Sequence, residues 1–84
     1  MTNLFFKYLQ YEKRYSKHTL ISYKSDLDQL YNFLGVHYPE TSIEEANHAI
    51  LTDWIISLAE GGINENSINR KLVTLRSFYK FLSK

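Results

Sequence analysis

The chain has 84 residues, of which 44% are hydrophobic and 23% charged, and it contains no cysteine. This length predicts a single domain with a small core and excludes an enzyme with a deep pocket between domains. The lack of cysteine excludes disulfides, thiolate zinc sites and a cysteine nucleophile. No apolar run is long enough to span a membrane and no signal peptide opens the sequence, so we expect a cytoplasmic protein with no membrane partner.

The charged residues are distributed unevenly along the chain. Residues 1–24 contain five cations and one acid, residues 25–65 contain eight acids and no Lys or Arg, and residues 66–84 contain five cations and no acid. If the two basic ends fold against each other, they form one positive face. Such a face favours a polyanion as partner.

Helical periodicity begins at the N-terminus and predicts two helices in the first half of the chain. The first helix is expected to end near Tyr11, and Ser16 has the side chain of an N-cap for the second. Gly35 is the residue expected to end the second helix. Its apolar stripe has helical spacing and consists of Leu20, Tyr23, Leu27, Leu30 and Leu34.

A short helical turn and a third helix follow the loop around Pro39. Ser42 and Glu45 have the spacing of a capping box, which predicts the short turn. Thr52 is the predicted N-cap of the third helix. The pair Gly61-Gly62 is expected to end that helix, and we interpret it as a turn rather than as a phosphate-binding loop.

Asn64 is the predicted N-cap of a last helix that runs over about residues 65–82. The apolar stripe of this helix consists of Ile68, Leu72, Leu75, Tyr79 and Leu82. No part of the chain alternates polar and apolar residues as a strand does. We therefore expect an all-α fold, a bundle of four main helices with one extra short helical turn.

Helical wheels predict a polar face on the second helix and another on the last. No Asp or Glu occurs between Asn66 and Ser83, whereas an ordinary solvated helix mixes both signs of charge. Short polar side chains let a helix approach phosphates, while Arg and Asn can hydrogen-bond to guanine and adenine. The expected DNA-binding residues are Lys17, His18, Ser22, Lys24 and Ser25 on one helix and Asn66, Ser67, Asn69, Arg70, Lys71, Thr74 and Arg76 on the other.

Two roles are expected within this set. Long cationic side chains at the borders of the faces are expected to contact phosphates, and these are Lys17, Lys24, Lys71 and Arg76. Asn66 and Arg70, nearer the middle of the last helix's face, are the candidates for contacts with base edges.

The sequence gives no support for a catalytic, cofactor or metal site. His18, His37 and His48 lack the mutual spacing of metal ligands. Ser, His and Asp occur without any arrangement that indicates a triad. We expect no catalytic residue, no cofactor and no small-molecule ligand.

Two segments resemble the N-terminal core-binding domain of the tyrosine recombinases, the family of phage integrases and Xer-type recombinases. Residues 16–27, SKHTLISYKSDL, follow the pattern S-x-x-T-x-x-x-Y-x-x-D-L of that domain. Residues 62–64 and 67–82, which include SINRKL and LRSFYKFL, resemble its last helix. The resemblance covers nearly the whole chain.

The resemblance implies a SAM-like orthogonal bundle that forms one half of a C-shaped clamp on duplex DNA, with the second and fourth main helices in the major groove. It also implies other recombinase protomers as partners. In the family the catalytic domain, with its tyrosine nucleophile, lies C-terminal to this one, so we expect residues 1–84 to be a DNA-binding domain that is not itself catalytic. The positions that match the family's DNA contacts are His18, Thr19, Ser22, Tyr23 and Ser25, and Asn66, Ser67, Arg70 and Thr74.

A helical protein–protein interaction module of SAM-like fold with no DNA role is the alternative. It requires an exposed apolar patch. The aromatic residues that could supply one, or could pack against a neighbouring protomer of a recombinase, are Phe6, Tyr11, Tyr15, Tyr31 and Phe81.

Overall fold

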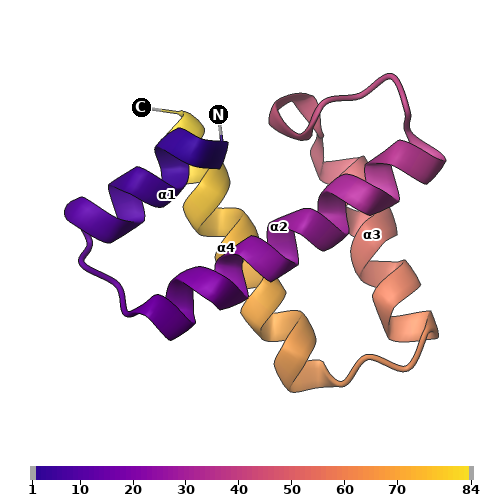
Figure 1. Ribbon diagram of the computed structural model, residues 1–84. Coiled ribbons are helices and arrows are strands. Elements are labelled where there is room, and N and C mark those ends of the chain that lie inside the picture. Colours follow the sequence, from indigo (N-terminus) through magenta and orange to yellow (C-terminus); the bar gives the residue numbers. More distant parts are fainter. Residues whose placement is uncertain (1, 84) are drawn as a thin grey trace.

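The computed structural model describes residues 2–83 and is helical throughout this range apart from the connecting loops (Figure 1). Its elements are α1 (Thr2–Tyr11), α2 (Lys17–His37), the 3-10 turn η1 (Ile43–Glu45), α3 (His48–Glu60) and α4 (Glu65–Leu82). Over the described residues this is the predicted all-α fold of four helices with one extra short turn.

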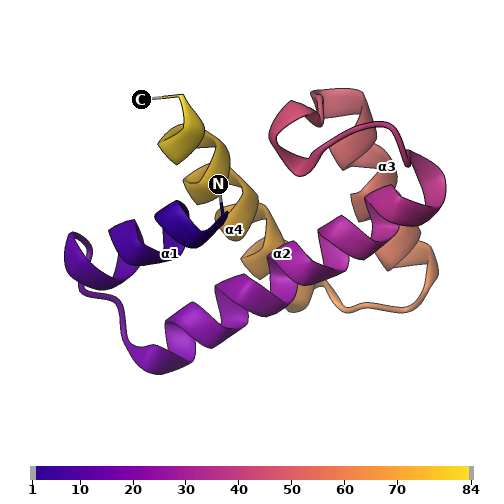
Figure 2. The same ribbon diagram turned by 45° about the horizontal axis from the view of Figure 1, so that its top comes forward.

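The two longest helices, α2 and α4, cross near the middle of the molecule (Figure 1). Twenty-one residues give α2 a length of about 31 Å, close to the 35 Å longest dimension of the molecule. α1 lies beside the C-terminal half of α4 at one end, whereas η1 and α3 lie at the other (Figure 2). The remaining dimensions are 28 and 17 Å, so the bundle is flat.

Aromatic rings join the two ends of the chain. Phe5 of α1 is fully buried, and its ring centroid lies 5.2 Å from that of Phe78 and 5.5 Å from that of Phe81. Burial of large apolar surfaces stabilises this contact, and each close ring pair adds to it. The two ends of the chain therefore pack together, but of the five cations of residues 1–24 only Lys7 lies on α1, so this contact does not by itself form the expected common positive face.

The predicted N-caps of two helices are confirmed. The side chain of Ser16 accepts a hydrogen bond from the backbone N–H of Thr19 at 3.2 Å, and that of Asn64 accepts from Ser67 at 2.9 Å. Each satisfies one of the N–H groups that the first turn of a helix leaves unpaired. The end of α3 at Gly61 is also as predicted, and Gly62 follows with φ of +90°, a conformation that favours glycine.

Two predicted boundaries are wrong. Thr52 lies inside α3, because Asn47 begins the helix five residues earlier by accepting a hydrogen bond from Ile50 at 3.0 Å. Gly35 lies inside α2, which continues to His37 and has Tyr38 as its C-cap. Pro39 ends the helix instead, since proline has no N–H and disfavours helical geometry in the residue before it.

The predicted turn at η1 is present, but its polar pair differs from a capping box. The hydroxyl of Ser42 donates to the Glu45 carboxylate at 2.8 Å, rather than accepting from a backbone N–H.

Candidate nucleic-acid interface

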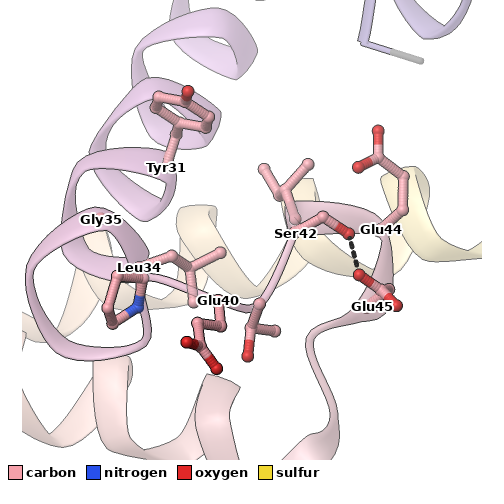
Figure 3. A pocket seen from close by; sticks show the side chains of 10 residues that line it. Tyr31, Leu34, Gly35, Glu40, Ser42, Glu44 and Glu45 are labelled. Atoms are coloured by element: carbon pink, nitrogen blue, oxygen red, sulfur yellow. Dashed lines mark hydrogen bonds between the residues drawn. The ribbon is translucent and has the colours of Figure 1, made fainter.

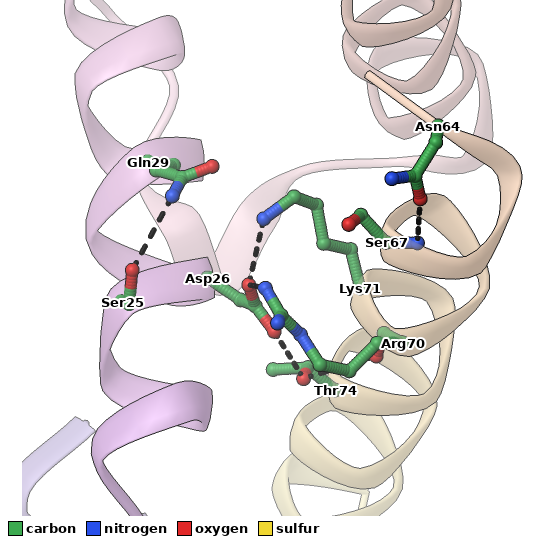
Figure 4. Close-up of polar contacts among 8 residues, drawn as sticks. All are labelled: Ser25, Asp26, Gln29, Asn64, Ser67, Arg70, Lys71 and Thr74. Atoms are coloured by element: carbon green, nitrogen blue, oxygen red, sulfur yellow. Dashed lines mark hydrogen bonds and ion pairs between the residues drawn. The ribbon is translucent and has the colours of Figure 1, made fainter.

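The carboxylate of Asp26 joins α2 to α4 at their crossing (Figure 4). Asp26 is almost fully buried, with 1% of its surface exposed. Oδ1 accepts hydrogen bonds from Arg70 Nη2 at 2.9 Å and from Lys71 Nζ at 2.8 Å, and Oδ2 accepts one from Thr74 Oγ1 at 2.9 Å. Residues three and four apart share one side of a helix, which lets these α4 side chains converge on a single carboxylate.

The junction cluster, defined as Asp26, Arg70, Lys71 and Thr74, holds two cations and one carboxylate. Burial raises the pKa of Asp26, but the hydrogen bonds from α4 outweigh this effect, so the pKa lies below its usual value of 3.8. The carboxylate is therefore ionised at neutral pH. The cluster then has a formal charge of +1, because one of its two cations is left uncompensated.

Arg70 is the cation of the junction cluster that reaches solvent. Its side chain is 48% exposed, whereas that of Lys71 is 4% exposed. A guanidinium has five N–H donors, and the hydrogen bond to Asp26 occupies one of them. Arg70 therefore presents a positive charge and several donors at the surface where α2 and α4 cross.

The structure corrects the predicted positions of Lys71 and Thr74, both of which are buried rather than on an outer face. The helical wheel, drawn through apolar residues alone, puts Leu72 at the centre of the buried side. The buried side of α4 is instead Lys71, Thr74, Leu75 and Phe78, and Leu72 is half-buried. Pairing with Asp26 allows the two polar side chains to enter the interior, since buried polar groups cost little when they are hydrogen-bonded.

The other predicted DNA-binding residues divide by exposure. Thr19 is half-buried and its hydroxyl lies 3.0 Å from that of Ser16, within the N-cap of α2. The ring of Tyr23 is buried, as expected for a residue of the apolar stripe. Ser22 and Ser67 are half-buried, and the exposed residues are Lys17, His18, Lys24, Ser25, Asn66, Asn69, Arg70 and Arg76.

The exposed and half-buried residues lie on more than one side of the bundle. His18, Ser22 and Asp26 are spaced four residues apart, so they form a row along α2 that leads to the junction cluster. Lys24 is two residues from Asp26, which turns it about 200° round the helix. It forms an exposed ion pair with Asp28 at 2.9 Å.

Arg76 also lies away from the junction cluster. Together with His48, Leu51 and Ile55 it lines a groove of about 490 Å³ between α3 and α4. Neither Lys24 nor Arg76 therefore adds its charge to that of Arg70 at the crossing.

The end of the molecule around η1 is acidic. A hollow of about 500 Å³ between the end of α2 and η1 is lined by Glu40, Glu44 and Glu45 (Figure 3). Carboxylates at this density repel phosphate groups. This end of the bundle is therefore unsuited to nucleic acid.

The five aromatic residues considered for a protein-binding patch do not form one exposed group. Phe6 and Phe81 pack against the core, and the ring of Tyr15 contacts that of Tyr23. Tyr11, Tyr15 and Tyr31 are exposed, at 70%, 37% and 66%. Exposed apolar surface occurs elsewhere, in the groove between α3 and α4, where Ile56 is 49% exposed.

Asp26 was missing from the residues selected on the sequence. Its position gives one signal: it follows Tyr23 by three residues and precedes Leu30 by four, so it lies on the buried side of α2. An acid at such a position requires a cationic partner. The sequence alone does not identify that partner, because Arg70 and Lys71 are 44 and 45 residues away.

The protein is an α-helical domain in which a buried ionic cluster joins two long crossed helices. The chain belongs to the family of phage integrase N-terminal SAM-like domains, whose model matches residues 2–84.

Its curated relatives include tyrosine recombinases of two kinds. The chain is 37% identical to tyrosine recombinase XerC of Bacillus licheniformis over 79 residues, which are 94% of this chain and 26% of that protein. It is 39% identical to tyrosine recombinase XerD of Rickettsia conorii over 79 residues, 93% of this chain and 25% of that protein. The chain thus spans about a quarter of the length of these relatives.

No solved structure matches the chain significantly. Within residues 2–83, the helices are too short or too polar to cross a membrane.

Proposed function

We propose that this domain binds duplex DNA as part of a site-specific tyrosine recombinase, with the surface around the α2–α4 crossing in the major groove. The observation that carries the proposal is Arg70, which is half-exposed at the crossing of two helices on a helix with no acid between residues 66 and 83. The recombinase names of the relatives support the recombination role. The catalytic residues of that reaction are proposed to lie outside this chain, and the reaction to take place on cytoplasmic DNA.

The proposed DNA-binding surface consists of the exposed and half-buried residues near the α2–α4 crossing, rather than of the whole polar faces that the helical wheels predicted. His18, Ser22 and Ser25 of α2 and Asn66, Asn69 and Arg70 of α4 make the central contacts, with Lys17 and Ser67 at the border. Lys24 and Arg76, which lie away from the crossing, contact phosphates of the flanking backbone. Lys71, Thr74 and Tyr23 act from the interior by fixing the positions of the two helices.

Binding by the isolated domain is expected to be weak and strongly dependent on salt. One half of a clamp lacks the contacts of the other half and the high effective concentration that linkage would give it. Neutralisation of three to five phosphates gives a slope of about −3 to −4.5 for the logarithm of the binding constant against the logarithm of the salt concentration.

The test is a fluorescence anisotropy titration of a labelled duplex at several salt concentrations. Arg70→Ala is expected to weaken binding to any duplex, and by about 1–3 kcal/mol where the duplex carries the recombination site. Lys7→Ala, which removes one charge from an exposed position of α1, is the control and is expected to change affinity much less. Binding that is independent of salt, or equal losses in the two variants, would contradict the proposed surface.

One observation favours a second candidate function, a protein-binding module. The groove between α3 and α4 is lined by Leu51, Ile55, Ile56 and Leu72, and its apolar side chains suit a helix of a partner, including another recombinase protomer. This function predicts binding that changes little with salt and is lost in Ile56→Asn. The DNA-binding function predicts that Ile56→Asn, which changes no charge and is remote from the crossing, retains most of its affinity for duplex.

A further inference from the structure

The junction cluster combines a residue that is accessible to a ligand with one that is not. Asp26 is buried and cannot touch DNA, yet it holds the half-exposed guanidinium of Arg70 through a hydrogen bond of 2.9 Å (Figure 4). We propose that Asp26 is a positioning residue for DNA binding: it fixes Arg70 at the α2–α4 crossing in the orientation that contacts the duplex. This inference rests on the proposed DNA-binding function.

The carboxylate is suited to this task because its three hydrogen bonds in the described structure all come from side chains of α4. Lys71 and Thr74 hold both oxygens of Asp26 in place, at 2.8 and 2.9 Å, and both are buried. The acceptor that Arg70 meets is therefore fixed relative to α4 as well as to α2. The single proton of the Thr74 hydroxyl is shared between Asp26 and the backbone carbonyl of Arg70, whose oxygen lies 3.3 Å from Oγ1, and this keeps the hydroxyl on the same turn of the helix.

A fixed Arg70 binds more tightly than a free one. An arginine side chain has many rotamers, and restricting them at an interface opposes association. When Asp26 restricts the guanidinium in the free protein, that entropy is lost on folding rather than on binding. The remaining N–H donors then point from a defined place, which suits the planar acceptors of phosphate or guanine.

Positioning and simple electrostatics predict opposite results when Asp26 is replaced. Loss of a negative charge near DNA strengthens binding if only charge matters. If Asp26 positions Arg70, its loss weakens binding although the domain becomes more positive. The sign of the change in affinity therefore separates the two explanations.

Asp26 is best replaced together with Lys71, because Asp26→Leu alone leaves a buried ammonium without a carboxylate and risks unfolding. The variant Asp26→Leu/Lys71→Met replaces the buried ion pair with apolar side chains of similar volume, which proteins often tolerate. Its reference is Lys71→Met, in which Asp26 retains Arg70 and Thr74. Circular dichroism and thermal melts establish that both are folded.

The experiment measures affinity for a mixed-sequence duplex by anisotropy at low salt. Adding Asp26→Leu to Lys71→Met is expected to weaken binding by about threefold to tenfold, within the range for residues of one network. When Arg70→Ala is also present, Asp26→Leu is expected to cause no further loss. Asp28→Leu, the same change at an exposed acid of α2 that pairs with Lys24, is the matched control and should strengthen binding.

Each outcome decides the proposal. Unchanged or tighter binding on adding Asp26→Leu would overturn it, as would an equal loss in the Arg70→Ala background. If wild type binds duplex and Arg70→Ala does not weaken binding, the role of Asp26 fails while DNA binding stands. If wild type does not bind duplex, the proposed function itself fails and the positioning role fails with it.

Discussion

At the scale of single residues, Asp26 is the residue that connects the packing of α2 on α4 with the proposed interface. Its carboxylate is buried, so it would be costly to ionise without the cations and the hydroxyl of α4. The same contacts join α2 to α4 and place Arg70 at the surface.

The lowered pKa of Asp26 predicts a component of acid sensitivity. The pKa of this carboxyl is lower in the folded than in the unfolded state, where it is near 3.8. The ionised carboxyl therefore stabilises the fold at every pH above about 3.8. This contribution is lost as the pH falls from there through the lower folded value. Urea unfolding from neutral pH downward should show wild type losing stability more steeply below pH 3.8 than Asp26→Leu/Lys71→Met, which lacks the carboxyl. Equal slopes in the two proteins would contradict this prediction.

Single polar residues were the least predictable feature of the site. The exposure of Asn66, Asn69 and Arg70 agrees with the positions expected from the sequence, but Lys71 and Thr74 are interior. An apolar wheel cannot reveal this, because the burial of a lysine depends on a carboxylate 45 residues away. Periodicity describes one helix at a time, whereas the junction cluster arises from two.

At the scale of elements, the boundaries are set by side chains that pair with the backbone at helix ends. Ser16, Asn47 and Asn64 each accept a hydrogen bond from an N–H of a first turn. The periodicity of apolar residues correctly predicted a helix at each of α1, α2, α3 and α4. The start of α3 was predicted wrongly at Thr52, although Ile50 and Leu51 precede Trp54 and Ile55 by four residues and so extend the apolar pattern toward Asn47.

The Asn64 cap is expected to matter for α4 and therefore for the proposed interface. Asn64→Ala removes the acceptor for the Ser67 N–H and should lower the free energy of unfolding by about 1 kcal/mol. Asn66→Ala, an exposed position two residues further on, is the control and should stay within about 0.5 kcal/mol of wild type. Chemical denaturation measures both, and equal losses would show that the cap does not stabilise α4.

At the scale of the whole molecule, the flat bundle has two chemically distinct ends. The end where α1 packs beside the C-terminal half of α4 (Figure 1) carries the cations Lys7 and Lys80, whereas Glu40, Glu44 and Glu45 line the hollow near η1 at the other end (Figure 3). Most acids of the middle segment lie in η1, α3 and the loops beside them, but Asp26 and Asp28 belong to α2, so the charge pattern along the sequence corresponds only in part to the distribution of charge in the fold. The resemblance to recombinases, carried by two short motifs, agrees with the family to which the chain belongs.

The most direct test of the proposed DNA-binding surface is an NMR titration of the isotopically labelled chain with duplex DNA. Backbone amides of α2 around His18–Gln29 and of α4 around Asn66–Arg70 should shift most, while those of η1 and α3 should stay nearly unchanged. The shifts should diminish as salt is added. Shifts centred on the groove between α3 and α4, or on the acidic hollow near η1, would contradict the proposed surface.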